Sequence, residues 1–101
     1  MRTISHTPAA DLDILDSALW YPSHIGERFL VAVETTEAAI RIKPALGALS
    51  GFNEIRFRSI PGFPEAIFYR HNDDHVVVIR VLHHGRNIDS LLESGGGEHR
   101  P

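Results

Sequence analysis

The stretch His75-Val76-Val77-Val78-Ile79-Arg80-Val81-Leu82-His83 decides the fold class of this chain. It is rich in β-branched residues and nearly continuously apolar, which is typical of a strand that is covered on both faces of a sheet. The preceding Asn72-Asp73-Asp74 has the composition of a hairpin turn, and Ala66-Ile67-Phe68-Tyr69-Arg70 predicts the strand before that turn. These residues therefore predict an antiparallel β-hairpin.

A third strand is predicted one step further toward the N-terminus. Apolar and charged residues alternate in the segment 54–58, as they do in a half-buried strand. We expect Ile55 and Phe57 to face the helices, and Arg56 and Arg58 to face outward. The three strands then form an antiparallel meander.

Two helices are predicted before these strands. The pair Thr7-Pro8 is suited to begin a helix, because a hydroxyl cap precedes a proline at the first helical position. Pro22 ends this helix, Ser23 is expected to cap a second one, and Pro44 ends the second. The apolar positions of the two helices recur at helical spacing and include Leu12, Leu15, Leu19, Ile25, Phe29, Val33 and Ile40.

These elements give an α+β fold, in which an N-terminal helical hairpin packs on a small antiparallel sheet. Residues 2–5 are long enough only for a short additional strand, and residues 45–53 are expected to be a loop. Asn87 is suited to cap a short C-terminal helix that runs through Leu91 and Leu92. We expect one domain over residues 1–94 and a disordered tail over residues 95–101.

Composition limits the function classes. The chain has 101 residues, of which 43% are hydrophobic, and this suffices for one core. It contains no cysteine, which excludes disulfides and thiolate metal sites and suits a reducing cytoplasm. No apolar run approaches the ~20 residues that span a bilayer, so we expect a soluble protein. The net charge of −3 argues against a general polyanion binder.

The sheet half of the chain is nevertheless slightly basic. Residues 54–86 contain five arginines against four acidic residues, together with four of the seven histidines. Strands lie about 5 Å apart, so outward arginines on neighbouring strands are able to converge on an anionic partner. The alternative is that they are solubilising charges. Arg80 is the most informative, because an arginine within an apolar strand needs a partner.

A metal site is not predicted. His83 and His84 are adjacent on a strand, so they point to opposite faces and cannot ligate one ion together. His71 and His75 flank the turn with Asp73 and Asp74, an arrangement that is more typical of a solvated hairpin tip.

The stretches Arg58-Ser59-Ile60-Pro61-Gly62-Phe63-Pro64, Ile67-Phe68-Tyr69-Arg70 and Arg80-Val81-Leu82-His83-x-x-Arg86 resemble the toxin subunit of ParE-type toxin–antitoxin modules. The resemblance covers roughly residues 8–92. It implies membership of the broad RelE/ParE superfamily, whose fold matches the one predicted above. Asn87 departs from the family pattern, which commonly has aspartate there, and His84-Gly85 differs from the usual small residues.

The resemblance leaves two branches to distinguish. RelE-like members cleave ribosome-bound messenger RNA without a metal, and in that branch the catalytic residues here would be Arg56, Arg58, Arg80, His83 and His84. However, Glu54, Glu65 and Ser90 stand near positions at which those enzymes carry basic or aromatic groups. An acidic residue opposes the stabilisation of a phosphorane. The resemblance therefore favours the ParE branch, whose members poison DNA gyrase and are not enzymes of this kind.

The ParE resemblance also implies partners and contact residues. We expect a small antitoxin that covers the apolar helical surface formed by Leu12, Leu15, Leu19, Phe29 and Val33. We expect the gyrase target to be contacted by Arg58, Tyr69, Arg70, Arg80, His83 and Arg86. No cofactor or membrane partner is expected, and nucleic acid would be involved only indirectly. A third reading is a non-toxic relative that binds the antitoxin and has no target.

Overall fold

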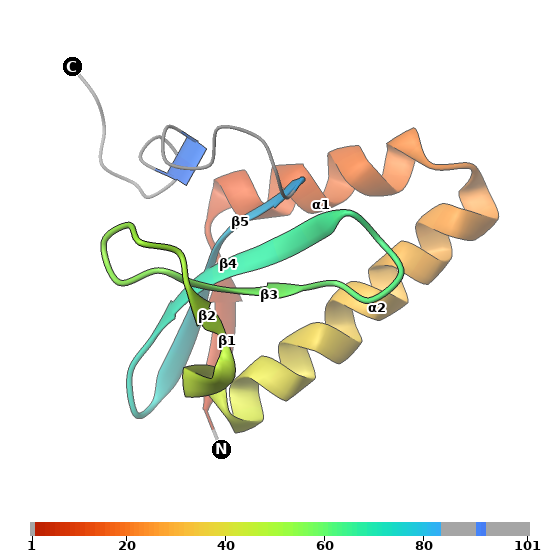
Figure 1. The fold of residues 1–101 in the computed structure, drawn as a ribbon. Coiled ribbons are helices and arrows are strands. Elements are labelled where there is room, and N and C mark those ends of the chain that lie inside the picture. The colour runs from red at the N-terminus through yellow and green to blue at the C-terminus, as the bar shows by residue number, and fades with distance from the viewer. Residues whose placement is uncertain (1, 84–90, 93–101) are drawn as a thin grey trace.

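The computed structural model describes residues 2–83 and 91–92 and contains two helices and five strands (Figure 1). In chain order the elements are β1 (Thr3–His6), α1 (Pro8–Trp20), α2 (Ser23–Ile42), the 3-10 turn η1 (Pro44–Leu46), β2 (Ala48–Leu49), β3 (Arg56–Ser59), β4 (Glu65–His71) and β5 (His75–His83). Residues 91 and 92 are helical. The expected helix start at Asn87 and the tail 95–101 lie outside the described residues.

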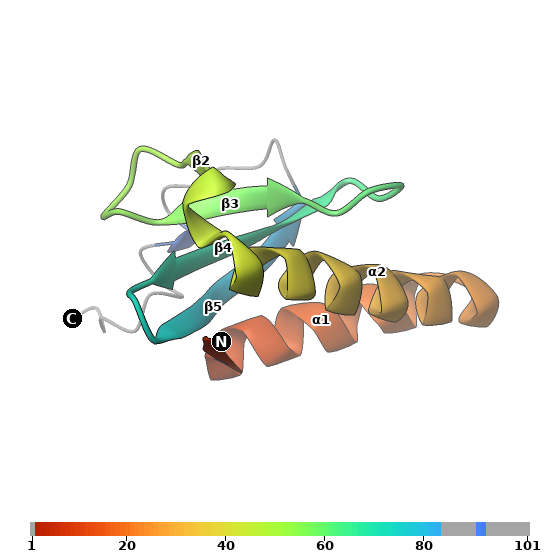
Figure 2. The same ribbon diagram turned by 90° about the horizontal axis from the view of Figure 1, so that it is seen from below.

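The strands form one mixed sheet in the order β1-β5-β4-β3-β2. The pairs from β2 to β5 are antiparallel, whereas β1 pairs with β5 in parallel. The two helices lie side by side on one face of this sheet (Figure 2). The α+β prediction of a helical hairpin on a sheet is therefore confirmed. The sheet is larger than the predicted meander. A short strand at residues 2–5 was considered, and β1 forms there, whereas β2 lies in the predicted loop and is too short for a periodic pattern to reveal it.

The helix boundaries follow from local chemistry. The Thr7 hydroxyl accepts a hydrogen bond from the backbone N–H of Ala10 at 3.0 Å and donates one to the carbonyl of Ile79 at 2.7 Å. This cap therefore both begins α1 and attaches it to the sheet. The prediction that Ser23 caps α2 is wrong: Ser23 is the first helical residue, Pro22 stands at the cap, and no side chain bonds there.

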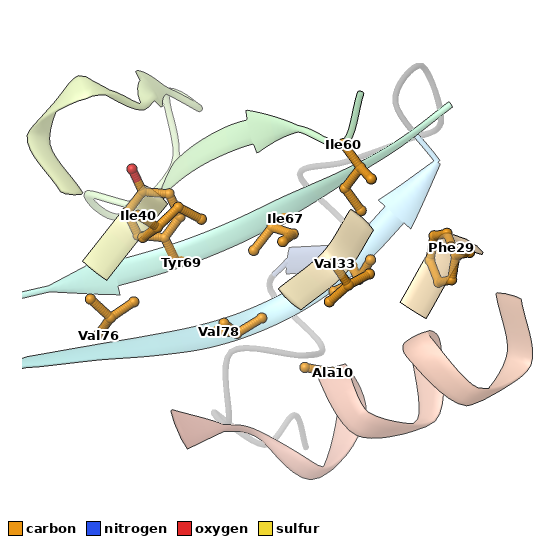
Figure 3. Packing of buried hydrophobic residues seen from close by; sticks show 10 residues of the cluster. Ala10, Phe29, Val33, Ile40, Ile60, Ile67, Tyr69, Val76 and Val78 are labelled. Carbon is orange, nitrogen blue, oxygen red and sulfur yellow. The ribbon is translucent and has the colours of Figure 1, made fainter. Parts of the chain in front are cut away.

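The main core lies between the helices and the sheet (Figure 3). Phe29, Val33 and Ile40 project from α2 onto Ile67 and Val78 of the two central strands, and all five side chains are buried. Hydrophobic burial of this kind is worth roughly 1.5–3 kcal/mol per side chain. This layer fixes the helical hairpin on the sheet.

The other face of the sheet carries a second apolar cluster, which includes Ile55, Phe68 and Leu82. Ile55 and Phe57 belong to this face, so the prediction that they face the helices is wrong. Arg56 and Arg58 instead share the helix side with Tyr69 and Ile67, the residues opposite them on β4, both in the main core. Alternation shows which residues share a face, but it does not show which face the helices cover.

Within the described residues, neither helix has the combination of length and apolar character that crossing a bilayer requires.

Candidate functional site

Arg80, the arginine that interrupts the apolar strand, is paired with Asp13 of α1. Its Nε and Nη2 donate to the two carboxylate oxygens at 2.6 and 2.8 Å, and its Nη1 donates to the carbonyl of Leu91 at 3.1 Å. The same carboxylate accepts the backbone N–H of Val81 at 3.0 Å. The hydrogen bond to Asp13 raises the pKa of Arg80 above its ordinary value, although burial acts to lower this pKa. The partner that an arginine in an apolar strand requires is therefore a residue of the same chain, Asp13.

The other predicted sheet residues do not come together in one patch. Arg58 lies opposite Ile67 on the helix side of the sheet, whereas Arg70 lies opposite Val77 on the other side. Tyr69 is fully buried, and its hydroxyl donates to the carbonyl of Pro44. The expectation that outward arginines converge is therefore wrong for Arg58 and Arg70.

The remaining predicted residues are placed as follows. Arg56 donates from Nη1 to the carbonyl of Gly47 at 2.8 Å, and Arg70 donates from Nε to the carbonyl of Asn53 at 3.2 Å. These two arginines therefore hold the loop between η1 and β3. His83 is exposed at the end of β5, and His84 and Arg86 lie outside the described residues.

A cleft of about 470 Å³ opens between the C-terminal half of α1 and the adjoining ends of β4 and β5. Its lining includes Trp20, Glu65 and His83. Glu65 is only 8% exposed, and the Tyr21 hydroxyl donates to its two oxygens at 2.9 and 3.2 Å. Burial and this carboxylate raise the pKa of Tyr21 to about 12. Sequence reasoning missed the cleft, because its lining comes from segments far apart in the chain that meet only when α1 packs against the ends of β4 and β5.

The outer face of α1 is apolar and exposed. Leu12, Leu15 and Leu19 are 60%, 51% and 73% exposed. The inward positions of α1 are two alanines and one isoleucine: Ala10 is in the main core, and Ile14 and Ala18 pack against it. Three leucines of this helix thus point away from the core, whereas an ordinary amphipathic helix turns its apolar residues inward.

Two of the five residues expected to contact an antitoxin are not on this surface. Phe29 and Val33 are buried in the main core, where a partner cannot reach them without opening the hairpin. The exposed candidates are Leu12, Leu15 and Leu19, which we call the leucine stripe.

Comparison with known proteins identifies the family. The sequence profile of the ParE toxins of type II toxin–antitoxin systems, parDE, matches residues 4–88. A solved structure described as the chromosomal ParDE toxin–antitoxin system from P. aeruginosa has a similar fold, with a TM-score of 0.64 and 21% sequence identity over 80% of this chain and 94% of that chain. No curated protein matches significantly. The chain is a small α+β protein of the toxin–antitoxin class, and it belongs to the ParE toxin family.

Proposed function

We propose that this protein inhibits DNA gyrase, blocks replication, and is neutralised by a cognate antitoxin that covers the leucine stripe. The family match supports the toxin class, and the ParE branch implies gyrase as the target. The leucine stripe is the observation that supports neutralisation by an antitoxin, because a row of exposed apolar side chains is typical of a protein–protein interface. Both partners would meet the protein in the cytoplasm.

The position of the basic groups disfavours the alternative, a RelE-like messenger RNA endonuclease. Metal-independent attack by a ribose 2′-OH needs a base, an acid and stabilisation of developing negative charge. Arg80 is neutralised by Asp13, and Arg58 lies on the opposite side of the sheet from it. His83 lines a cleft whose neighbouring carboxylate, Glu65, repels phosphate. These contacts argue against a phosphate site formed by Arg58, Arg80 and His83.

Expression of the chain without an antitoxin tests the proposal. We expect filamentous cells, DNA-damage signalling and intact messenger RNA, all reversed when the antitoxin is expressed as well. Unimpaired growth despite stable complex formation would instead support the non-toxic relative. Extensively cleaved messages would support the endonuclease.

The leucine stripe makes a separate prediction. Burying a leucine is worth roughly 1.5–3 kcal/mol, so Leu15→Ala should weaken antitoxin binding about tenfold or more. Titration calorimetry measures the change, and Thr35→Ala on the exposed face of α2 is the control. Equal affinities of Leu15→Ala and the wild type for the antitoxin would show that this part of α1 does not belong to the interface. Thermal unfolding of Leu15→Ala should stay close to that of the wild type, since Leu15 is already exposed.

A further inference from the structure

We propose that the cleft beside Trp20 is a binding site for an arginine side chain, supplied by the antitoxin segment that covers the leucine stripe. The source of the arginine rests on the proposed function, whereas the chemistry of the cleft does not. The inference starts from Trp20, the one tryptophan of the chain, which is 80% exposed at the end of α1 and lines the cleft. An exposed indole beside a cavity offers a flat face on which a guanidinium stacks.

The charge around this indole is negative. Asp16 and Glu65 both line the cleft. The hydrogen bond that Glu65 accepts comes from Tyr21, a neutral phenol, so its oxygens are satisfied without cancellation of its charge. Asp13 also lines the cleft, but its charge is balanced by Arg80. A buried carboxylate that faces a cavity is stabilised by a cation that enters it.

The end of α1 adds to this potential independently of the side chains. The carbonyl end of a helix carries partial negative charge, which many helices balance with a basic residue in the last turn. The last turn of α1 contains no basic residue. Trp20 lies in that turn, and the turn supplies no basic side chain that would compete with a cation in the cleft.

The geometry favours a guanidinium over other groups. A phosphate or carboxylate would be repelled by Asp16 and Glu65. A guanidinium pairs with a carboxylate in bidentate fashion while its plane rests on the indole, which an ammonium group cannot do equally well. Arg80 and His83 also line the cleft, and the charge of Arg80 is balanced by Asp13.

The cleft adjoins the leucine stripe along α1. Asp16 lines the cleft and lies one helical turn from Leu12 and from Leu19, which are both exposed. A chain that covers Leu12, Leu15 and Leu19 therefore arrives at the mouth of the cleft. We infer that the leucines supply apolar burial and that the cleft supplies selectivity for a partner with a correctly placed arginine.

A fluorescence titration of the full chain tests the cleft by itself, with Trp20 as the reporter. N-acetyl-arginine amide should change the emission saturably, whereas N-acetyl-citrulline amide, its neutral isostere, should not at the same ionic strength. Asp16→Asn should weaken the response about tenfold, as expected for loss of a charged hydrogen bond. The control is Asp74→Asn, at the turn between β4 and β5, which should respond as the wild type does. An equal response to citrulline, or an unchanged one in Asp16→Asn, overturns the inference.

Antitoxin binding tests the source of the arginine. Asp16→Asn should weaken the complex about tenfold and reduce its salt dependence. If Asp16→Asn binds the antitoxin as tightly as the wild type does, the inference fails and the proposed function stands. If the wild-type chain does not bind the antitoxin at all, the proposed function fails, and the titration still decides whether the cleft accepts a guanidinium.

Discussion

At the scale of single residues, the pairing of Arg80 with Asp13 shows how far sequence reasoning reaches. An arginine within an apolar strand has to find a partner, and that requirement was visible in the sequence. The identity of the partner was not visible, because Asp13 is 67 residues away along the chain and resembles the other acidic residues of the first helix. Only the packing of α1 along β5 brings the two together.

The pair gives a stability prediction. Asp13→Asn leaves the Arg80 guanidinium, which is 15% exposed, without its counter-charge. Removing one partner of such a pair costs about 3 kcal/mol. Urea unfolding should show this loss as a lower midpoint with an unchanged slope.

Asp16→Asn is the matched control, since Asp16 is an exposed acidic residue one turn later in α1. It should change the free energy of unfolding by less than about 0.5 kcal/mol. Similar losses in the two variants would mean that the Asp13 carboxylate contributes nothing beyond helix charge.

At the scale of elements, the long helices and strands were predictable, and of the two edge strands only the first was considered. Thr7-Pro8 marked the start of α1, and β5 was predicted with the bounds that it has. By contrast, β2 has two residues inside the predicted loop 45–53. The orientation of β3 was predicted incorrectly, because apolar side chains cover both faces of this sheet.

The contact between the two helices depends on Gly26. A Cβ atom at this position would lie 2.4 Å from the backbone carbonyl oxygen of Ala18, which cannot move away as a flexible side chain would. In an exposed helix, replacing glycine by alanine stabilises by about 1 kcal/mol. Here Gly26→Ala should destabilise instead, because the helices must separate.

Thermal unfolding of Gly26→Ala measures the sign of this effect. Glu27→Ala, at the neighbouring exposed position of α2, is the control and should unfold close to the wild type. A higher melting temperature for Gly26→Ala would contradict the close contact of α1 and α2.

His6 joins three elements. From the end of β1, its Nδ1 lies 2.9 Å from a carboxylate oxygen of Asp11 in α1, and its Nε2 lies 2.7 Å from one of Glu37 in α2. Burial by itself lowers the pKa of His6, but the charge of Glu37 and the hydrogen bonds to both carboxylates outweigh it, so the pKa lies above 6.5. Burial raises the pKa of Glu37 above 4.5, with smaller contributions from Glu34 and Asp11 and against the effect of His6.

Both shifts make the fold less stable as pH rises. A raised histidine pKa contributes stability that is present below pH 6.5 and is lost as pH rises through the folded-state pKa. A raised glutamate pKa acts in the same direction, since the folded state holds its proton more tightly than the unfolded chain. The stability of the wild type relative to the double variant His6→Gln/Glu37→Gln should therefore fall as the pH rises from below 6.5 through the folded-state pKa of His6.

Urea unfolding of both proteins across this range measures that difference. A difference that stays constant with pH, or that grows as pH rises, would show that His6 is not held as a cation between the two carboxylates.

At the scale of the whole molecule, one side of the helical hairpin exposes large apolar side chains that the fold does not bury. Ala10, Ile14 and Ala18 of α1 face the core, and its leucines face outward beside an acidic cleft. The sequence predicted the family and the leucine positions, because helical periodicity and the motifs of β4 and β5 are local. It could not predict that Phe29 and Val33 would be buried while the leucines stay exposed, since that depends on how the two helices rotate against the sheet.

A gyrase assay tests the central claim most directly. Purified protein is incubated with DNA gyrase, ATP and relaxed plasmid, with and without the antitoxin, and ribosome-bound message is incubated in parallel. We predict loss of supercoiling and accumulation of gyrase-cleaved plasmid, both abolished by the antitoxin, while the message stays intact. Undisturbed supercoiling together with cleaved message would contradict the gyrase proposal. It would indicate instead that the arginines and histidines of the sheet are catalytic.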